Sequence, residues 1–312
     1  MKKELRAALI LLFASVIWGF SMPIQREADR FLSPMTFNAC RFTLAAIVVL
    51  PFALTDCRKK ADPLRKKEVL PGILLGLALF LSALFQQIGV GESGAGKAGF
   101  LTALYVVLVP ICGIFFGKKT GLTTWLALLI ALPALYLLCV PKNEAFRLAP
   151  SDGAILLGSV GWTAHILMTD SFVKKISPLK LCSVQFASAA AFNWIGAVLT
   201  EKITPGALGS ALLPIVYCGV LSTGFGFVCQ GVGQKDCRPA IASLIMSMEA
   251  VFSLIGGALL LGERMETRGL IGCALMFLAV LLAQAGALFG GKKNAPDADA
   301  AGDETAAPRD GE

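Results

Sequence analysis

Polar and charged side chains interrupt several long apolar stretches of this chain, and their types indicate binding rather than covalent chemistry. Arg41 could bind a carboxylate, and Glu249 and His165 could exchange protons. The chain has a single histidine, and none of its nine cysteines forms a Cys-x-x-Cys pair. Neither a zinc site nor a nucleophile with its base is indicated, so we expect no enzymatic activity, no metal and no other cofactor.

Two triads of side chains, each headed by a tryptophan, recur at the spacing i, i+3, i+7, which places all three on one face of a helix. The triads are Trp18, Ser21 and Gln25, and, 144 positions later, Trp162, His165 and Thr169. Both tryptophans fall well inside apolar stretches, whereas an interfacial belt would hold them at the ends. We predict that the triads lie on two facing helices and line a substrate cavity; packing between helices is the alternative.

The same shift of 144 positions relates Arg41 to Gln185 and Gln86 to Gln230. Polar groups are costly inside a membrane, so each of these must face a partner or a wet cavity. Arg41 binds a substrate carboxylate or neutralises a carboxylate on another helix. Gln86 and Gln230 form hydrogen bonds with the substrate or within a gate of the transport path, or they only join helices to each other. Tyr105 is a further candidate for the wall of the cavity.

Glu249 stands near the middle of another apolar stretch. A carboxylate at that depth is a candidate for proton coupling, and His165 is the second candidate. The alternative for Glu249 is a fixed ion pair or a hydrogen bond that caps a broken helix.

These pairings belong to an internal repeat. Shifted by 144 positions, the first half of the chain lies over the second without a gap for about ninety residues, so that Ser33-Pro34 falls on Ser177-Pro178 and Phe42 on Phe186. Tryptophan occurs only four times, so its recurrence in register is hard to ascribe to composition. A duplicated unit in a membrane usually places a transport path between its halves.

Composition indicates that the repeated unit is embedded in a membrane. Hydrophobic residues make up 56% of the chain, charged residues 16%, and the mean hydropathy is +0.72. Helices are expected, because a helix satisfies its own backbone hydrogen bonds in lipid. The expected spans, five in each repeat, are residues 5–24, 35–54, 69–90, 98–117, 122–141, 152–173, 180–200, 211–231, 239–261 and 269–290.

Lysine and arginine gather in alternate loops. The loops on the side of the amino terminus hold more than twice as many of these residues as the others, and residues 58–67 alone hold six. This bias predicts that both termini are cytoplasmic. Because five spans is an odd number, the second repeat must be inverted relative to the first. The net charge of +7 then reflects topology and contact with anionic lipids, and no nucleic-acid partner is expected.

We therefore expect an all-α integral membrane protein of ten transmembrane helices, arranged as two inverted five-helix repeats. Residues 1–145 would form the first repeat and residues 146–291 the second. Residues 292–312, rich in Ala, Asp, Pro and Gly, would form a disordered cytoplasmic tail.

Several motifs of the chain are familiar together: residues 16–21, Ser33-Pro34, Arg41-Phe42, residues 95–110 and residues 247–264. They resemble the EamA-type members of the drug/metabolite transporter superfamily, over roughly residues 5–290. The resemblance implies a ten-helix carrier of the inner membrane, often an exporter of amino acids or related metabolites, with a cavity between the repeats and no covalent cofactor.

The chain departs from the regular family pattern at two places. Gly117-Lys118-Lys119 stands where the second repeat has Gly262-Glu263-Arg264, and Leu104 stands opposite Glu249. We therefore expect the chemistry of the cavity to be asymmetric.

The predicted function is secondary transport of a small, zwitterionic metabolite across the cell membrane by alternating access, with export as the expected direction and a proton as the candidate coupling ion. The triad tryptophans and Tyr105 would supply aromatic walls, and Arg41, His165 and Gln25 polar recognition. A membrane scaffold or sensor, and an intramembrane enzyme, are the alternatives. The expected partners are the substrate and membrane lipids, and a homodimer is compatible with the sequence.

Overall fold

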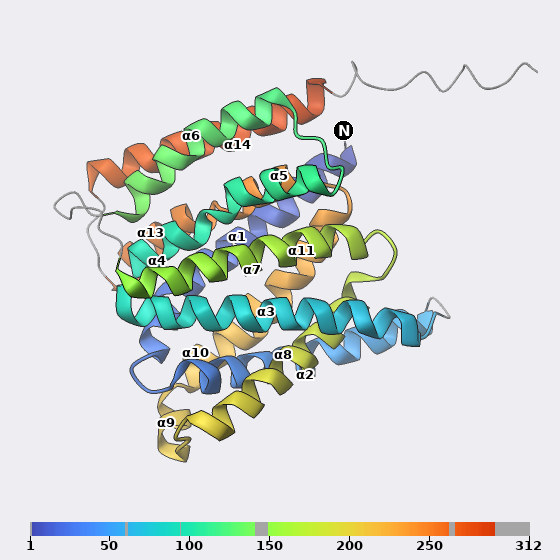
Figure 1. Cartoon of the computed structure of the whole chain (residues 1–312), viewed down its shortest axis with the longest axis vertical. Helices are drawn as coiled ribbons and strands as arrows, with labels where there is room; N and C mark the ends of the chain where they lie inside the picture. Colours follow the sequence, from blue (N-terminus) through green and yellow to red (C-terminus); the bar gives the residue numbers. More distant parts are fainter. Residues whose placement is uncertain (1, 60–61, 94, 141–148, 262–265, 291–312) are drawn as a thin grey trace, which may run out of the picture.

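The computed structural model describes residues 2–59, 62–93, 95–140, 149–261 and 266–290, which form a bundle of helices (Figure 1). The predicted tail at 292–312 and residues 262–264 of the last motif lie outside the described residues. The helices are α1 (Lys2–Ala28), α2 (Pro34–Lys59), α3 (Lys66–Ser93), α4 (Ala95–Ala103), α5 (Tyr105–Phe115), α6 (Leu122–Cys139), α7 (Pro150–Phe172), α8 (Pro178–Thr200), α9 (Pro205–Ser210), α10 (Leu212–Val216), the π-helix η1 (Tyr217–Phe225), α11 (Gly226–Lys235), α12 (Pro239–Met246), α13 (Glu249–Leu261) and α14 (Thr267–Gly290).

Eight helical stretches of the described chain are long and apolar enough to cross a membrane. The other two expected spans are α4 with α5, a shorter apolar run that is interrupted, and α7, which carries two aspartates and the histidine. Together they account for the ten predicted spans, and the described residues contain no strand. The ten-helix, all-α prediction is confirmed.

The described ends of the chain lie on one side of the bundle, where α1 begins and α14 ends (Figure 1). We call this side the terminal face, and the other side the opposite face. The loops that follow α2, α5, α7 and α11 lie on the terminal face. The chain therefore crosses the bundle an even number of times, as ten spans require.

The two halves of the chain build the same contacts with their roles exchanged. In the first, Gly89 at the end of α3 packs so closely on Ile155 of α7 that an added Cβ would overlap that side chain. In the second, Gly233 at the end of α11 packs in the same way on Leu11 of α1. Gly233 and Ile155 follow Gly89 and Leu11 by 144 positions. Such an exchange relates the repeats by a pseudo-two-fold axis, as inverted repeats require.

The antiparallel helices α2 and α8, which the repeat shift relates to each other, also fix each other's ends. At one end, Glu201 accepts hydrogen bonds from the backbone N–H groups of Met35 and Thr36, at 2.9 and 2.8 Å. At the other, Ser177 donates to Asp56 at 2.9 Å. Carboxylates at helix N-termini satisfy free N–H groups and complement the helix dipole.

Two spans are interrupted at equivalent positions. α5 begins at Tyr105 and α13 begins at Glu249, and the two residues are 144 positions apart. The expectation that Leu104 stands opposite Glu249 is therefore wrong by one residue. The Tyr105 hydroxyl lies 3.4 Å from Glu249 Oε1. Because a residue can touch its own repeat mate only at the symmetry axis, this pair marks the pseudo-two-fold axis in the middle of the bundle.

Candidate functional site

A central cavity lies at the two helix interruptions. Its volume, traced by the centres of water-sized spheres, is about 60 Å³. Nine predicted site residues line it: Trp18, Ser21, Gln25, Arg41, Gln86, Tyr105, Trp162, Gln230 and Glu249. The sequence missed six more lining residues: Met22, Thr102, Ile166, Ser222, Phe227 and Met246.

The two triad tryptophans do not stand on directly facing helices. Phe227 of α11 lies between them, with its ring centroid 5.1 Å from that of Trp18 and 5.9 Å from that of Trp162. The ring of Phe227 stacks on Trp162 at 18° and is tilted against Trp18 at 55°. Aromatic groups at these separations attract one another. The prediction of facing triads is corrected accordingly, because a third aromatic side chain bridges them.

Trp18 and Trp162 are repeat mates with different hydrogen bonding. Trp18 Nε1 donates to the carbonyl oxygen of Ser222 at 2.9 Å, within the π-helix η1. A π-helical turn displaces carbonyl groups from their regular places, and such turns are frequent at functional sites. Trp162 Nε1 is buried and has no hydrogen-bond partner among the described residues. The corresponding part of α3 is regular, so only one half of the site has this tie.

Arg41 enters the cavity from α2, and the Asp29 carboxylate, with which it interacts electrostatically, lies beyond ion-pair distance. Its Nη1 donates to Gln25 Oε1 at 2.9 Å, and Gln25 Nε2 donates to Ser21 Oγ at 3.1 Å. The guanidinium also lies 5.3 Å from the Phe37 ring and 5.0 Å from the Phe42 ring. Arg41 is 5% exposed, and no carboxylate of the described chain comes within ion-pair distance of it. The guanidinium is thus held in place by Gln25, and some of its N–H groups remain available to a ligand.

Glu249 lines the same cavity and forms no ion pair in the described chain. Its contact is the hydroxyl of Tyr105 on the pseudo-two-fold axis. A cavity that presents an unpaired guanidinium and an unpaired carboxylate suits a ligand that carries both signs of charge, because each buried charge needs compensation.

The three remaining predicted residues, His165, Thr169 and Gln185, do not line the central cavity. They line a neighbouring side pocket of about 10 Å³, and His165 Nε2 lies 3.0 Å from Gln185 Oε1. Phe227 and Gln230 line both spaces. The single cavity that the sequence predicts is therefore two adjoining chambers with Phe227 between them.

A basic vestibule of about 1060 Å³ opens at the terminal face. Two of the lysines that line it are held by the buried Asp170, which accepts hydrogen bonds from Lys118 at 2.5 Å and from Lys174 at 2.9 Å. The other basic residues that line it are Lys119, Lys235 and Arg238.

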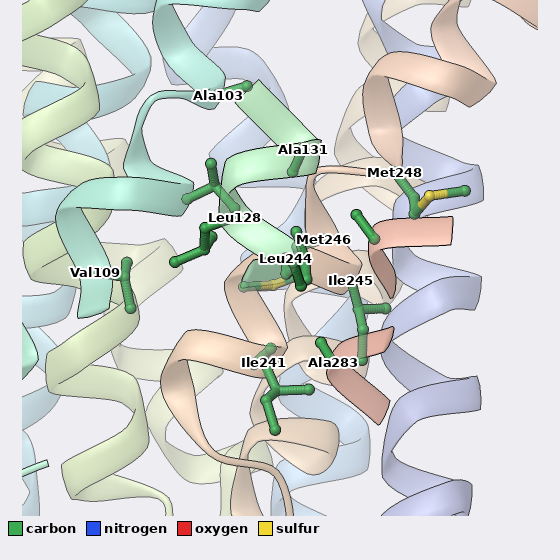
Figure 2. Close-up of a cluster of buried hydrophobic side chains, with 14 of the residues drawn as sticks. Ala103, Val109, Leu128, Ala131, Ile241, Leu244, Ile245, Met246, Met248 and Ala283 are labelled. Carbon is green, nitrogen blue, oxygen red and sulfur yellow. The ribbon is translucent and has the colours of Figure 1, made fainter. Parts of the chain in front are cut away.

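An apolar plug separates the vestibule from the central cavity. Val109 and Ile241 line the vestibule and Met246 lines the cavity, and all three belong to one buried apolar cluster. Figure 2 shows these side chains gathered together with those of Leu128 and Leu244. Towards the opposite face, the turn that follows α1 is joined to α3, because Gln87 donates a hydrogen bond to Asp29. The structure thus has close contacts on both sides of the cavity.

Comparison with known proteins identifies relatives of the whole chain. The model of the EamA-like transporter family matches residues 5–140 and 150–284. An uncharacterized transporter of Archaeoglobus fulgidus is 27% identical, over 90% of this chain and 86% of its own. The uncharacterized transporter YyaM of Bacillus subtilis is 23% identical, over 90% of this chain and 94% of its own. A WAT1-related protein of Arabidopsis thaliana is 21% identical, over 80% of each chain.

The fold also recurs among solved structures. One crystal structure, 18% identical in sequence, superimposes with a TM-score of 0.77 and covers 93% of this chain and 99% of its own. At that identity the likeness concerns the fold.

Proposed function

Because the chain belongs to the EamA-like transporter family, we propose that it is a secondary transporter that moves a small zwitterionic metabolite of the amino-acid class across the cytoplasmic membrane by alternating access. The observation that supports this most is the central cavity, where Arg41 and Glu249 are both unpaired with charged side chains of the described chain.

In this proposal Arg41 binds the substrate carboxylate, and Glu249 binds the substrate ammonium group. The aromatic side chains Trp18, Trp162 and Phe227 enclose the apolar part of the substrate. Charge-assisted hydrogen bonds of this kind are among the strong ones, so they offset the loss of hydration of both charged ends.

Transport requires the two repeats to rock about the cavity so that one face opens at a time. The excess of basic loops supports a cytoplasmic position for the terminal face and for both termini. Substrate would enter from the basic vestibule when the apolar plug moves aside, and it would leave at the opposite face. Export is therefore the direction that we propose, with membrane lipids around the bundle.

Counterflow into proteoliposomes tests the binding role of the cavity. The purified protein is reconstituted with an unlabelled amino acid inside, and entry of the same labelled amino acid is measured across the proteinogenic set. We expect exchange of at least one amino acid, and we expect Arg41→Gln to weaken it by about tenfold to a hundredfold, the usual worth of a charge-assisted hydrogen bond. Gly153→Ala, at a helix position with open space around it, is the control. Wild-type vesicles that exchange no amino acid would refute the proposed substrate class.

Proton coupling through Glu249 is tested in the same vesicles. Substrate ammonium and proton would compete for this carboxylate, so that release of one requires binding of the other. Glu249→Gln is then expected to abolish uptake driven by a pH gradient. If gradient-driven uptake by Glu249→Gln matches that of the wild type, Glu249 is not the coupling group.

A further inference from the structure

The side pocket behind Phe227 holds three buried polar groups that lack hydrogen-bond partners in the described chain. They are His165 Nδ1, Thr169 Oγ1 and Gln230 Oε1. The residues are 1%, 5% and 2% exposed, respectively. Buried polar atoms are nearly always paired, so three in one small pocket point to a ligand.

The neighbours of these groups determine what each can offer. Gln185 turns its amide oxygen towards His165, so Nε2 carries a proton and donates to it at 3.0 Å. No carboxylate lines the pocket, and we therefore take the ring as neutral, which leaves Nδ1 as an acceptor. Gln230 uses its Nε2 to donate to Gln234 Oε1 at 2.9 Å, so its Oε1 is an acceptor as well. Gln234 in turn is fixed by donating to the carbonyl oxygen of Ile166 at 3.0 Å.

The pocket thus presents two acceptors and the hydroxyl of Thr169. Such a set selects a group that donates hydrogen bonds. A charged ammonium group is disfavoured, because no residue that lines the pocket carries a formal charge to compensate it. The space of about 10 Å³ is that open to the centre of a water-sized sphere, so the pocket has room for one group of about the size of a water molecule.

We propose that this pocket is a specificity subsite for one hydroxyl group of the substrate, with a water molecule in its place when the substrate lacks that group. This inference rests on the proposed function and narrows it to amino acids with a hydroxylated side chain. Phe227 and Gln230 border both chambers, so a substrate in the central cavity reaches the pocket past the Phe227 ring. A hydroxyl group donates to one acceptor and accepts from Thr169.

The first experiment needs no substrate. His165 is the only histidine, so protein labelled with [15N]histidine gives one imidazole in a nuclear magnetic resonance spectrum. We expect the proton on Nε2, and a hydrogen bond at the unprotonated Nδ1 that Thr169→Val weakens. Thr163→Val, a buried threonine on the same helix outside the pocket, is the matched control and should leave the spectrum unchanged. A proton on Nδ1 would overturn the proposal, because the pocket would then offer a donor.

The second experiment separates a substrate hydroxyl from water. L-serine is compared with L-alanine, and L-threonine with L-2-aminobutyrate, as competitors of counterflow in proteoliposomes. We expect the hydroxylated member of each pair to compete at least about tenfold better, since a site built to bond a hydroxyl rejects the analogue that lacks it. Thr169→Val should reduce this ratio to within about twofold, whereas Thr163→Val, outside the pocket, should keep the ratio of the wild type.

The outcomes are distinguishable. Equal competition within each pair, together with a hydrogen-bonded Nδ1, would show a water site only and would overturn the substrate subsite. If no amino acid is exchanged, the proposed function fails and the subsite for a substrate hydroxyl falls with it. The spectrum of His165 would still decide whether the pocket binds a donor.

Discussion

The two tryptophans of the cavity occupy equivalent positions of the two repeats, but they differ in their hydrogen bonding. Trp18 ties α1 to a carbonyl group of the π-helix, whereas the indole N–H of Trp162 lacks a partner in the described chain. Of the two tryptophans, Trp18 alone therefore contributes a hydrogen bond between the first helix and the eighth span, where Tyr217 also donates to the carbonyl oxygen of Ile17. Trp162 lines the cavity and retains the stacking on Phe227.

This difference gives a prediction with a built-in control. Trp18→Phe should destabilise the protein by about 1–2 kcal/mol, because it leaves the buried Ser222 carbonyl without its donor. Trp162→Phe should be close to neutral, since it removes a donor that has no partner. Thermal unfolding in detergent, followed by circular dichroism, compares the two. Equal losses of stability would mean that the indole hydrogen bond contributes nothing.

Sequence reasoning found most cavity residues because they are polar or aromatic at positions where the repeat is visible. Nine of the named residues line the central cavity and the other three line the side pocket next to it. It could not find Phe227, which is one of twenty phenylalanines and has Ala83 as its repeat mate. Without Phe227, nothing in the sequence separates the two chambers.

At the scale of elements, the length of the apolar stretches predicts where the spans lie, but it does not predict where the helices are interrupted. The chain between α4 and α5 breaks at Leu104 without a proline or glycine, and so does the chain between α12 and α13, at residues 247–248. The π-helix likewise lies in an ordinary apolar stretch. Packing between distant helices fixes these features, and local propensity carries no signal for them.

Close approach of α1 to α11 makes Gly226 a sensitive position. A Cβ added there would lie 2.5 Å from Trp18 Nε1, so Gly226→Ala should push the indole off Ser222. We expect a loss of about 1–3 kcal/mol from overpacking, whereas Gly153→Ala, in open space on α7, should be neutral or slightly stabilising. Thermal unfolding of the two variants provides the comparison, and a stable Gly226→Ala protein would contradict this packing.

The start of α8 is held to the loop between α2 and α3 by a contact that depends on pH. Lys180, 3% exposed, donates a hydrogen bond to Asp62 Oδ2 at 2.6 Å, and this lowers the pKa of the Asp62 carboxyl below its usual 3.8. Because the pKa is lower in the folded protein, the stabilisation is complete above pH 3.8 and is lost as the pH falls through the lowered value.

Asp62→Asn should therefore lower the melting temperature at about pH 7, and the difference from the wild type should shrink as the pH falls through the lowered pKa of Asp62. Asp236→Asn, on another loop of the terminal face, is the control. A difference that persists unchanged at acidic pH would show that the charge of Asp62 is not responsible.

At the scale of the whole molecule, the proposed alternating access would use the exchanged contacts, one near each face. In that proposal the contact of Gly89 with Ile155 closes the opposite face, and the contact of Gly233 with Leu11 closes the terminal face. A methyl group at either glycine should wedge its own side open, because overpacking costs about 1–3 kcal/mol in the closed arrangement only.

A cysteine placed at Ser21 in the cavity reports which side opens. Under the proposed topology, Gly89→Ala should increase its labelling by an impermeant thiol reagent in intact cells, by about tenfold. Gly233→Ala should do so in inside-out membrane vesicles. The same variants with Ser21 intact correct for native cysteines. If both substitutions increased labelling from the same side, the assignment of the two faces would be wrong.

The contact between Tyr105 and Glu249 also bears on how such a chain arose. Had the two halves been separate, identical proteins, each residue on the axis would have met its own copy, and two glutamates there would repel each other. A phenol opposite a carboxylate is possible only when the two positions mutate independently. The pairing therefore dates from after the duplication, and a homodimer of identical half-length chains could not have had it.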